Sequence, residues 1–391
     1  MIEKNIDKRL ARGVVERIGS HSLLTFQTNC NNPIKRAQPL HDHRQAIDAV
    51  MRWLLEPETN IKQIRSLADI HAVGHRVVHG GEKFQKSVRI NPEILRGIED
   101  CIELAPLHNP SNIKGIRAVY ELLGDGVPQV AVFDTAFHST MPDISYLYGI
   151  PYQYYRRYKI RRYGFHGTSH RYIAYRYRQH LGIGLKDVNI ISLHLGNGSS
   201  VCAIQNGKSM DTSMGFTPLE GLVMGTRAGD IDFSIAEYLT HKEGLTLNQI
   251  DMLLNKQSGL LGISGLTSDM RELLEECDEN QDRRAKLAID IFCNRVQKYI
   301  GAYFVEMDKV DAIVFTGGIG ENSAVIRKLI CKKLSSIGLK LSERSDNSVK
   351  GDITRISTEK SPLHAYVVPT NEELLIARDT LRVIKNAPRR W

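Results

Sequence analysis

The stretch Asn189-Ile190-Ile191-Ser192-Leu193-His194-Leu195-Gly196-Asn197-Gly198-Ser199-Ser200 decides the fold of this chain. Its apolar, β-branched first half predicts a strand over 189–195, and a second strand follows over 200–205 before the hairpin turn Asn206-Gly207. A glycine-rich turn between two strands can direct successive backbone N–H groups into a concavity that holds a phosphate. Glycine and asparagine are equally typical of a plain tight turn, so both interpretations stay open.

A second glycine-rich segment, Phe315-Thr316-Gly317-Gly318-Ile319-Gly320-Glu321-Asn322, runs from a predicted strand into the start of a helix. Glycine there lets a ligand approach the backbone at a helix N-terminus, where the dipole favours anions. Two better-known nucleotide motifs are excluded. Ser323 occupies the third glycine position of a dinucleotide fingerprint, and Cys202 occupies the first glycine position of a P-loop that would end at Gly207-Lys208-Ser209.

Two further turns carry charged and ring side chains. The segment 74–82 offers Arg76 between His75 and His79. On a strand those histidines lie roughly 13 Å apart, from four rises of ~3.3 Å, so Arg76 as an anion clamp is preferred to a metal pair. In the segment 163–170, His166 lies between two glycines just before a predicted helix, for which Thr168 or Ser169 can serve as N-cap. His166 is either a structural or a functional histidine.

Strands that alternate with helices predict a layered α/β fold. In the helix expected over 284–306, Phe292, Val296, Tyr299 and Tyr303 recur at helical spacing, which predicts core packing. The expected strands cover 70–79, 130–137, 189–195, 200–205, 312–316 and 365–369, and the other expected helices cover 113–123 and 233–240.

The composition excludes several classes of protein. No apolar run approaches the roughly 18 residues that a membrane span requires, and the first ten residues hold no apolar signal core. The six cysteines are scattered with no CxxC pair, which favours a reducing cytoplasm. The net charge of +8 permits anionic ligands without demanding nucleic acid.

One local cluster of basic and tyrosine residues, over 156–178, admits two interpretations. Arginines interleaved with aromatic rings could hold single-stranded nucleic acid. The preferred interpretation is an amphipathic helix over 171–180 with a solvated basic face, so neither nucleic acid nor a membrane is expected as a partner.

Taken together, these segments resemble the acetate kinase family. The resemblance implies the two-domain α/β fold shared with sugar kinases, actin and the ATPase domain of Hsp70, and reversible transfer of a phosphoryl group from ATP to acetate, giving acetyl phosphate and ADP. It also implies a homodimer. The matching segments follow that family's order: 75–82, 105–110, 132–138, 162–170, 194–199, 211–230, 268–271, 316–322 and 369–374.

The resemblance assigns roles residue by residue. Arg76 and Arg227 would hold the carboxylate and the transferring phosphoryl group, and His166 would donate to an oxygen of that group. Asp134 matches the family's catalytic carboxylate. We expect it to orient Mg²⁺ or to fix Arg227, because a carboxylic acid with a pKa near 4 to 5 is already ionised at pH 7.

The remaining assignments concern the nucleotide, the metal and the acyl group. The resemblance implies a preference for acetate, because the position of Val78 tends to hold a smaller residue in propionate-preferring relatives. One methylene is worth only ~1 to 3 kcal/mol of discrimination, so propionate is expected as a slower substrate. Propionate or butyrate kinase is the alternative. The implied nucleotide residues are His194, Leu195, Gly196, Asn197, Gly198, Asp269, Met270, Arg271, Gly317, Gly318, Ile319, Gly320 and Glu321, the ligand of Mg²⁺ (or Mn²⁺) is Glu372, and the acyl wall is Val78, Leu107, Phe165 and Pro218.

The sequence departs from the family at its beginning. Members open with a strand and an Asn-x-Gly-Ser-Ser-Ser-x-Lys turn, whereas this chain runs directly from Met1 into a segment, 10–18, that resembles the family's next strand. We expect two domains, at 1–188 and 189–391, with the last helix packing back on the first domain. If the two domains are duplicates, the first is about 15 residues shorter than the second. We expect a start codon placed too far downstream, a truncated gene or a short variant.

The consequence of that departure is an expectation about folding and activity. Loss of an internal strand leaves unpaired backbone groups that cost on the order of 1 to 3 kcal/mol each. The chain as written is therefore expected to fold poorly and to be weakly active. A catalytically impaired homologue that binds nucleotide without forming acyl phosphate is the second alternative.

Overall fold

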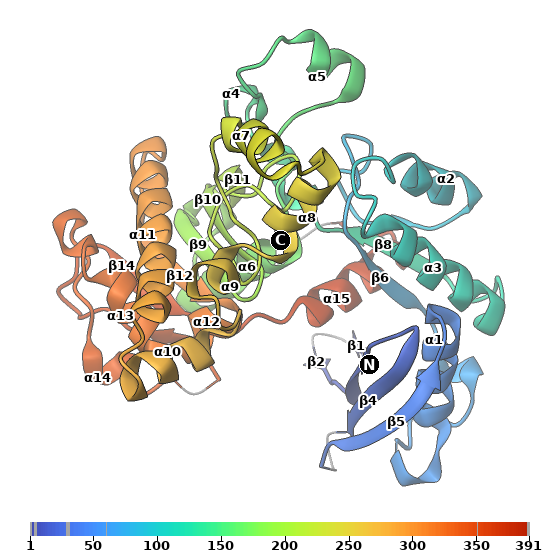
Figure 1. Ribbon diagram of the computed structural model, residues 1–391. Coiled ribbons are helices and arrows are strands. Elements are labelled where there is room, and N and C mark those ends of the chain that lie inside the picture. The colour runs from blue at the N-terminus through green and yellow to red at the C-terminus, as the bar shows by residue number, and fades with distance from the viewer. Residues whose placement is uncertain (1, 4–5, 29–31, 60, 350, 389–391) are drawn as a thin grey trace. The chain divides into compact units, whose positions relative to one another are not determined.

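The structure of the protein is a computed structural model that describes residues 2–3, 6–28, 32–59, 61–349 and 351–388. By its internal contacts the chain forms two compact units (Figure 1). Unit 1 comprises Met1–Ala136 and Glu372–Arg390, and unit 2 comprises Phe137–Asn371. The boundary predicted at residue 188 was inferred from duplication in the sequence, which contacts do not test, so it stays a prediction.

Unit 2 is built on one six-stranded sheet with the order β11-β10-β9-β12-β14-β13. Its strands are β9 (Ile190–Leu195), β10 (Ser199–Gln205), β11 (Lys208–Thr212), β12 (Ala312–Thr316), β13 (Thr354–Arg355) and β14 (His364–Val367). Its helices are α4 (Asp143–Tyr146), α5 (Gln153–Tyr158), α6 (Gly167–Leu181), α7 (Ser234–Glu243), α8 (Leu247–Lys256), α9 (Gly259–Ser264), α10 (Met270–Glu279), α11 (Arg283–Glu306), α12 (Gly317–Asn322), α13 (Ala324–Cys331) and α14 (Glu343–Asp346).

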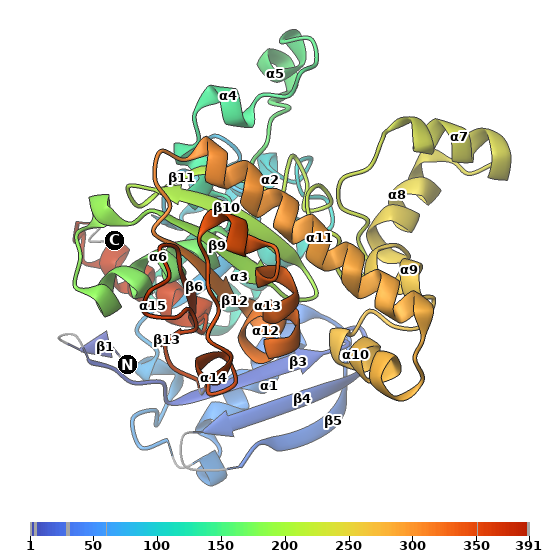
Figure 2. The same cartoon turned by 90° about the vertical axis from the view of Figure 1, so that its left-hand side faces the viewer.

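Alternation along β9 sorts its side chains onto two faces of this sheet. Ile191, Leu193 and Leu195 belong to the core cluster that includes Phe292 and Val296 of α11. Figure 2 shows α11 running across the sheet on that side. The polar side chains between them face the other way, where Ser192 and His194 form hydrogen bonds with residues of α6. The strand is therefore apolar toward α11 and polar toward α6.

The long helix confirms its predicted packing. Phe292, Val296 and Tyr303 are buried, and Tyr299 packs against the same cluster. The strand over 312–316 is observed as predicted, and those over 189–195 and 200–205 within one residue. The Asn206-Gly207 hairpin is confirmed, because both residues have positive φ and β10 pairs antiparallel with β11.

The predicted N-cap of α6 is wrong. The helix begins at Gly167 with His166 as its N-cap. Ser169 is not available to cap it, because its hydroxyl lies 2.8 Å from His194 Nδ1 and 3.1 Å from Thr370 Oγ1.

Unit 1 holds two separate three-stranded sheets, with the orders β3-β4-β5 and β6-β8-β7. Its strands are β1 (Ile2–Glu3), β2 (Ile6–Asp7), β3 (Ala11–Glu16), β4 (Ser20–Thr28), β5 (Ile34–Leu40), β6 (Val73–Val77), β7 (Val88–Arg89) and β8 (Gln129–Phe133). Its helices are α1 (His43–Leu55), α2 (Pro92–Asp100), α3 (Asn109–Leu123) and α15 (Glu372–Ile384). Both units also contain short 3₁₀ helices. These helices, η1 to η5, cover Pro57–Thr59, Leu67–Asp69, Ala136–Thr140, Leu185–Asp187 and Leu334–Ile337.

Each sheet of unit 1 has its own core. Leu24 and Phe26 of β4 pack with Trp53 of α1, whose ring stacks on Phe26 at 4.3 Å. Val77 and Phe133 pack with residues of α2 and α3. Within the described part of the chain, β3 pairs only with β4 and β6 only with β8, so both are edge strands. The strand predicted to be missing from this domain stays a prediction.

No helix among the residues covered by the structure combines the length and the apolar character that crossing a membrane requires.

Candidate active site

The two glycine-rich turns of unit 2 lie at neighbouring strand ends. β9 and β12 are parallel, with His194 opposite Thr316, so the chain leaves both strands at the same edge. Gly317 has φ +77°, and a Cβ there would lie 2.7 Å from the Leu195 carbonyl oxygen, so only glycine fits. Glu321 Oε1 accepts hydrogen bonds from the backbone N–H groups of Gly317 (2.9 Å) and Thr370 (3.0 Å). Glu321 thus holds the second turn in shape.

The loop that carries Arg227 is pressed against the first turn. A Cβ on Gly225 would lie 1.8 Å from Asn197 Oδ1, and the Gly225 N–H donates to the Asn197 carbonyl at 3.0 Å. This close approach brings Arg227 over Gly198. The ideal Cβ position of Gly198 is 3.5 Å from Arg227 Nη1 and 3.5 Å from His166 Nε2. Glycine at position 198 leaves the space in front of both groups open.

Arg227 has the electrostatics of an anion-binding residue. It forms no ion pair with any residue that the structure describes, and its Nη1 donates a long hydrogen bond to the Met224 sulfur, at 3.7 Å. Burial without a counter-charge lowers the pKa of the Arg227 guanidinium. An anion in the space over Gly198 would offset that desolvation.

His166 is held in an uncommon backbone conformation. Its φ is +55°, in the left-handed region that non-glycine residues rarely adopt and that is concentrated at functional sites. Its Nδ1 lies 2.9 Å from Ser200 Oγ, and its ring lies against that of His194 with centroids 4.2 Å apart. The flanking glycines were the signal in the sequence.

In unit 1, Arg76 is bound by two predicted site residues. Val77 of β6 lies opposite Phe133 of β8, so Arg76 and Asp134 lie near the carboxyl ends of adjacent parallel strands. Arg76 Nη2 donates to Asp134 Oδ2 at 2.7 Å, and Arg76 Nε lies 3.9 Å from Glu372 Oε2 at the start of α15. The Asp134 side chain is 1% exposed and its charge raises the pKa of Arg76.

These two carboxylates fit a magnesium site of a particular kind. The structure groups no three His, Cys, Asp or Glu side chains into a metal cluster among its described residues. Asp134 and Glu372 both approach Arg76, and such a pair suits Mg²⁺ that completes its coordination with phosphate oxygens and water.

The other predicted nucleotide residues lie on the surface at α10. Asp269 caps this helix, accepts the Arg271 N–H at 2.9 Å and pairs with the Arg271 guanidinium at 2.6 Å. Met270 is 3% exposed and packs in the core. Only Asp269 and Arg271 therefore present side chains there.

The predicted acyl-wall residues are divided between the units. Val78 follows β6 in unit 1, where its N–H donates to Asn112 Oδ1 at 3.0 Å. Leu107, also in unit 1, is 67% exposed. Phe165 and Pro218 belong to unit 2, where Phe165 is buried and Pro218 partly buried.

His75 and His79 serve the fold of unit 1. The His75 ring lies 2.6 Å from Gln129 Oε1, and His79 Nδ1 accepts the Gly81 N–H at 3.0 Å. Burial lowers the pKa of His79 to about 3, so this ring is neutral.

The basic and tyrosine cluster over 156–178 is partly internal. Arg161 is 8% exposed and stacks on Tyr146 at 3.6 Å, and Arg162 pairs with Glu220 at 2.6 Å. Arg171 is 6% exposed, so the predicted solvated basic face of α6 is wrong at this position. Arg161 and Arg162 stabilise the fold, because tyrosine rings surround the first and carboxylates of the same unit pair with the second.

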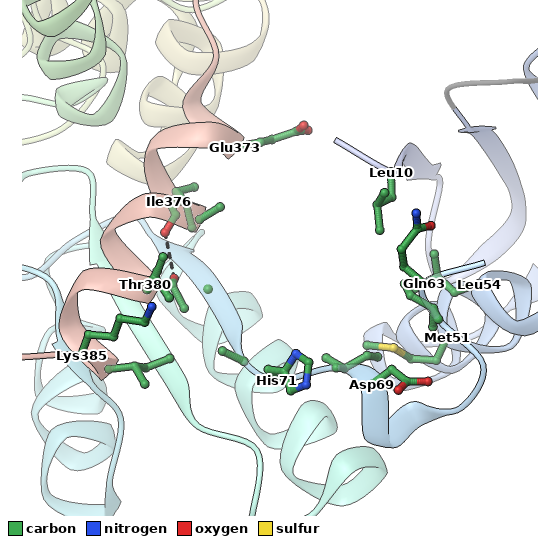
Figure 3. A pocket seen from close by; sticks show the side chains of 17 residues that line it. Leu10, Met51, Leu54, Gln63, Asp69, His71, Glu373, Ile376, Thr380 and Lys385 are labelled. Carbon is green, nitrogen blue, oxygen red and sulfur yellow. Dashed lines mark hydrogen bonds between the residues drawn. The ribbon is translucent and has the colours of Figure 1, made fainter. Parts of the chain in front are cut away.

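A pocket of about 870 Å³ lies in unit 1, apart from the predicted site residues (Figure 3). Ile376 and Thr380 of α15 line one side, Leu10 and Met51 the other, and His71 lies between them. Its lining reaches from Leu10, just before β3, to Gly74 of β6. The pocket therefore extends between the two edge strands of unit 1.

Sequence reasoning missed three residues behind His166. His170, Ser192 and Ser200 are fully buried and linked by hydrogen bonds. The signal was present, because His166 and His170 are four residues apart at the start of a predicted helix, and Ser192 and His194 alternate with apolar residues in a predicted strand.

Comparisons of the sequence and the structure with known proteins indicate one family. Residues 1–378 match the Acetokinase family. Acetate kinase of Chloroherpeton thalassium is 57% identical over 390 residues, covering 98% of this chain and 94% of that protein. The crystal structure of Porphyromonas gingivalis acetate kinase has a TM-score of 0.90 at 43% identity, covering 96% and 93% of the two chains. A propionate kinase from Francisella tularensis has a TM-score of 0.88 at 43% identity, covering 97% and 93%.

These matches confirm the expected α/β fold, which extends over nearly the whole chain. This chain belongs to the acetokinase family.

Proposed function

We propose that this protein is an acetate kinase, which transfers the γ-phosphoryl group of ATP reversibly to acetate. The observation that carries this proposal in the structure is Arg227, a partly buried guanidinium without an ion pair in the described part of the chain, which shares the space over Gly198 with His166 Nε2. Family membership and relatives named acetate kinase support the same reaction.

The chemistry follows from two mutually repelling anions. An oxygen of acetate attacks the γ-phosphorus, the bond from that phosphorus to the ADP oxygen breaks, and acetyl phosphate and ADP form. Such a loose transition state is catalysed mainly by positioning and charge neutralisation. We assign charge neutralisation to Arg76 and Arg227, and donation to a phosphoryl oxygen to His166 Nε2.

Asp134 is assigned an orienting role. Acetate is already ionised at neutral pH, so no proton has to be removed from the nucleophile. The short hydrogen bond from Arg76 engages the Asp134 carboxylate within unit 1. We therefore assign Asp134 the role of orienting the Arg76 guanidinium within unit 1.

Asp134 and Glu372 are the residues that would hold Mg²⁺ beside the phosphates. When bound, Mg²⁺ neutralises charge on the phosphate oxygens. For ATP and ADP, the turns 194–198 and 317–321 offer backbone N–H groups at adjacent strand ends, and Asp269 and Arg271 offer surface side chains near the sugar and base.

Propionate kinase is the second candidate, because a solved propionate kinase is as similar in sequence as the solved acetate kinase, at 43% identity. The test is acyl phosphate formation from acetate, propionate and butyrate, measured as kcat/KM. We expect acetate to be preferred, with propionate slower by about 10- to 100-fold, the value of one methylene. A higher kcat/KM for propionate or butyrate would reassign the substrate, and nucleotide binding without acyl phosphate would indicate an impaired homologue.

We propose a cytoplasmic homodimer. Unit 2 exposes large apolar side chains on and next to α7 and α8, among them Phe233 (80%), Tyr238 (61%) and Leu247 (68%). Figure 2 shows α7 and α8 extending away from the sheet of unit 2. Exposed apolar side chains that gather on one surface are typical of interfaces. Light scattering should give a dimer mass for the wild type and a smaller mass for Phe233→Asp, with Lys298→Asp, at an exposed position of α11, as control.

A further inference from the structure

Behind His166 lies a buried chain of alternating hydroxyl and imidazole groups: Ser192, His170, Ser200 and His166. The Ser192 hydroxyl lies 2.9 Å from His170 Nδ1, His170 Nε2 lies 2.8 Å from Ser200 Oγ, and Ser200 Oγ lies 2.9 Å from His166 Nδ1. His170, Ser192 and Ser200 are all 0% exposed. This series of hydrogen bonds ends at the His166 ring, whose Nε2 lies over Gly198.

The direction of these hydrogen bonds is decided at Ser192. A serine hydroxyl has one hydrogen to donate, and a neutral imidazole has one donor and one acceptor nitrogen. Among the described residues, the Ser192 hydroxyl forms a hydrogen bond only with His170. Because a buried donor without an acceptor is costly, this hydroxyl donates to His170 Nδ1.

The remaining protons then follow in order. His170 Nδ1 is the acceptor, so the hydrogen of neutral His170 is on Nε2 and is donated to Ser200. The Ser200 hydroxyl, accepting from His170, donates its own hydrogen to His166 Nδ1. Neutral His166 must therefore carry its hydrogen on Nε2, the nitrogen that faces the space shared with Arg227.

We propose that His170 is a positioning residue that acts through Ser200 to hold His166 as the Nε2–H tautomer, ready to donate to the transferring phosphoryl group. With the opposite tautomer, His166 would present a lone pair to an anionic oxygen. The arrangement also explains why His166 is kept in a left-handed conformation, since Nδ1 reaches Ser200 from the N-cap position of α6.

This inference rests on the proposed function only for its catalytic consequence. The tautomer itself can be read by NMR from the wild-type protein without substrate, so it does not depend on a variant that folds. Two-bond ¹H–¹⁵N spectra of protein labelled with ¹⁵N-histidine, with His166→Gln used to assign the His166 signals, should show a neutral ring with hydrogen on Nε2. A neutral ring with hydrogen on Nδ1, or a doubly protonated ring at neutral pH, would overturn the proposal.

Kinetics of matched variants test the consequence. Ser200→Ala and His170→Leu break the chain, and both should lower kcat by about 10-fold or more while KM for ATP and for acetate changes less than about 2-fold. Ser200→Thr keeps the hydroxyl and His170→Gln keeps an N–H donor toward Ser200, so both should recover most of kcat. His180→Leu, on the exposed end of the same helix, is the control.

A failure of the proposed function and a failure of the positioning proposal give different results. If His166→Ala keeps the wild-type kcat, the catalytic role of His166 in the proposed function fails, whereas the tautomer stands or falls on the spectrum. If His170→Gln and His170→Leu lose equal activity, or if both KM values rise with the fall in kcat, His170 has only a structural role and the positioning proposal is wrong.

Discussion

Arg227 and Arg76 are assigned to the same reaction step, but opposite effects on stability are expected when each is replaced by methionine. Arg227 has a pKa lowered by burial and no ion pair among the residues described, whereas the pKa of Arg76 is raised by Asp134. Methionine keeps the apolar stem of either side chain and removes the charge. The two variants therefore separate catalytic loss from loss of folding.

The magnitudes follow from these surroundings. Loss of a guanidinium that neutralises a phosphoryl transition state costs about 10³-fold or more in kcat, roughly 4 kcal/mol. Without ligand, Arg227→Met should leave stability unchanged or raise it by about 1 kcal/mol, because an uncompensated desolvation is removed. Arg76→Met leaves the Asp134 carboxylate, which is 1% exposed, without the guanidinium that pairs with it. Because Arg76 itself is 42% exposed, we expect the free energy of unfolding to fall by only about 1 to 3 kcal/mol.

The assays are initial rates of acetyl phosphate formation and thermal unfolding followed by circular dichroism without ligand. Both variants should be nearly inactive, but only Arg76→Met should unfold at a lower temperature than the wild type. ATP should raise the midpoint of the wild type more than that of Arg227→Met, because binding stabilises in proportion to affinity. An Arg227→Met protein that keeps kcat within ten-fold, or that loses as much stability as Arg76→Met, would refute the reasoning.

Two further predictions concern Gly198 and Asp211 of unit 2. Gly198→Ala puts a methyl group 3.5 Å from His166 Nε2 and Arg227 Nη1. The KM for ATP should rise by about ten-fold, the cost of an imperfectly paired phosphate, while the unfolding midpoint stays unchanged. An unaltered KM would show that the phosphate binds elsewhere. Burial raises the pKa of Asp211 to about 7, above its unfolded value near 3.8, so ionised Asp211 opposes folding increasingly as pH rises from about 4 to 7. Asp211→Asn should therefore be more stable than the wild type at pH 8, and the difference between their unfolding midpoints should be smaller at pH 5. A difference between the midpoints that does not change with pH would contradict this.

The two glycine-rich turns of unit 2 were read correctly from the sequence because a turn depends on neighbours along the chain. The turn after Leu195 and the turn after Phe315 were predicted between a strand and a strand, and between a strand and a helix, and both are observed. The glycines beside His166 drew attention to this residue, and the structure adds that its φ is +55°. The family followed from the order of such motifs, and the comparisons confirm it.

What the sequence alone determined about this protein is its α/β class and its family, and it supplied the residues that we propose to bind an anion. What only the tertiary structure decided is which of those residues touch: β9 beside β12, Arg76 against an Asp134 that is 58 positions away, and His170 reaching His166 through Ser200. Burial of Arg161 and Arg171 was likewise invisible in the sequence. Periodicity encodes a local face, whereas pairing across tens of residues depends on strand register and on helices crossing between strands, which no short pattern records.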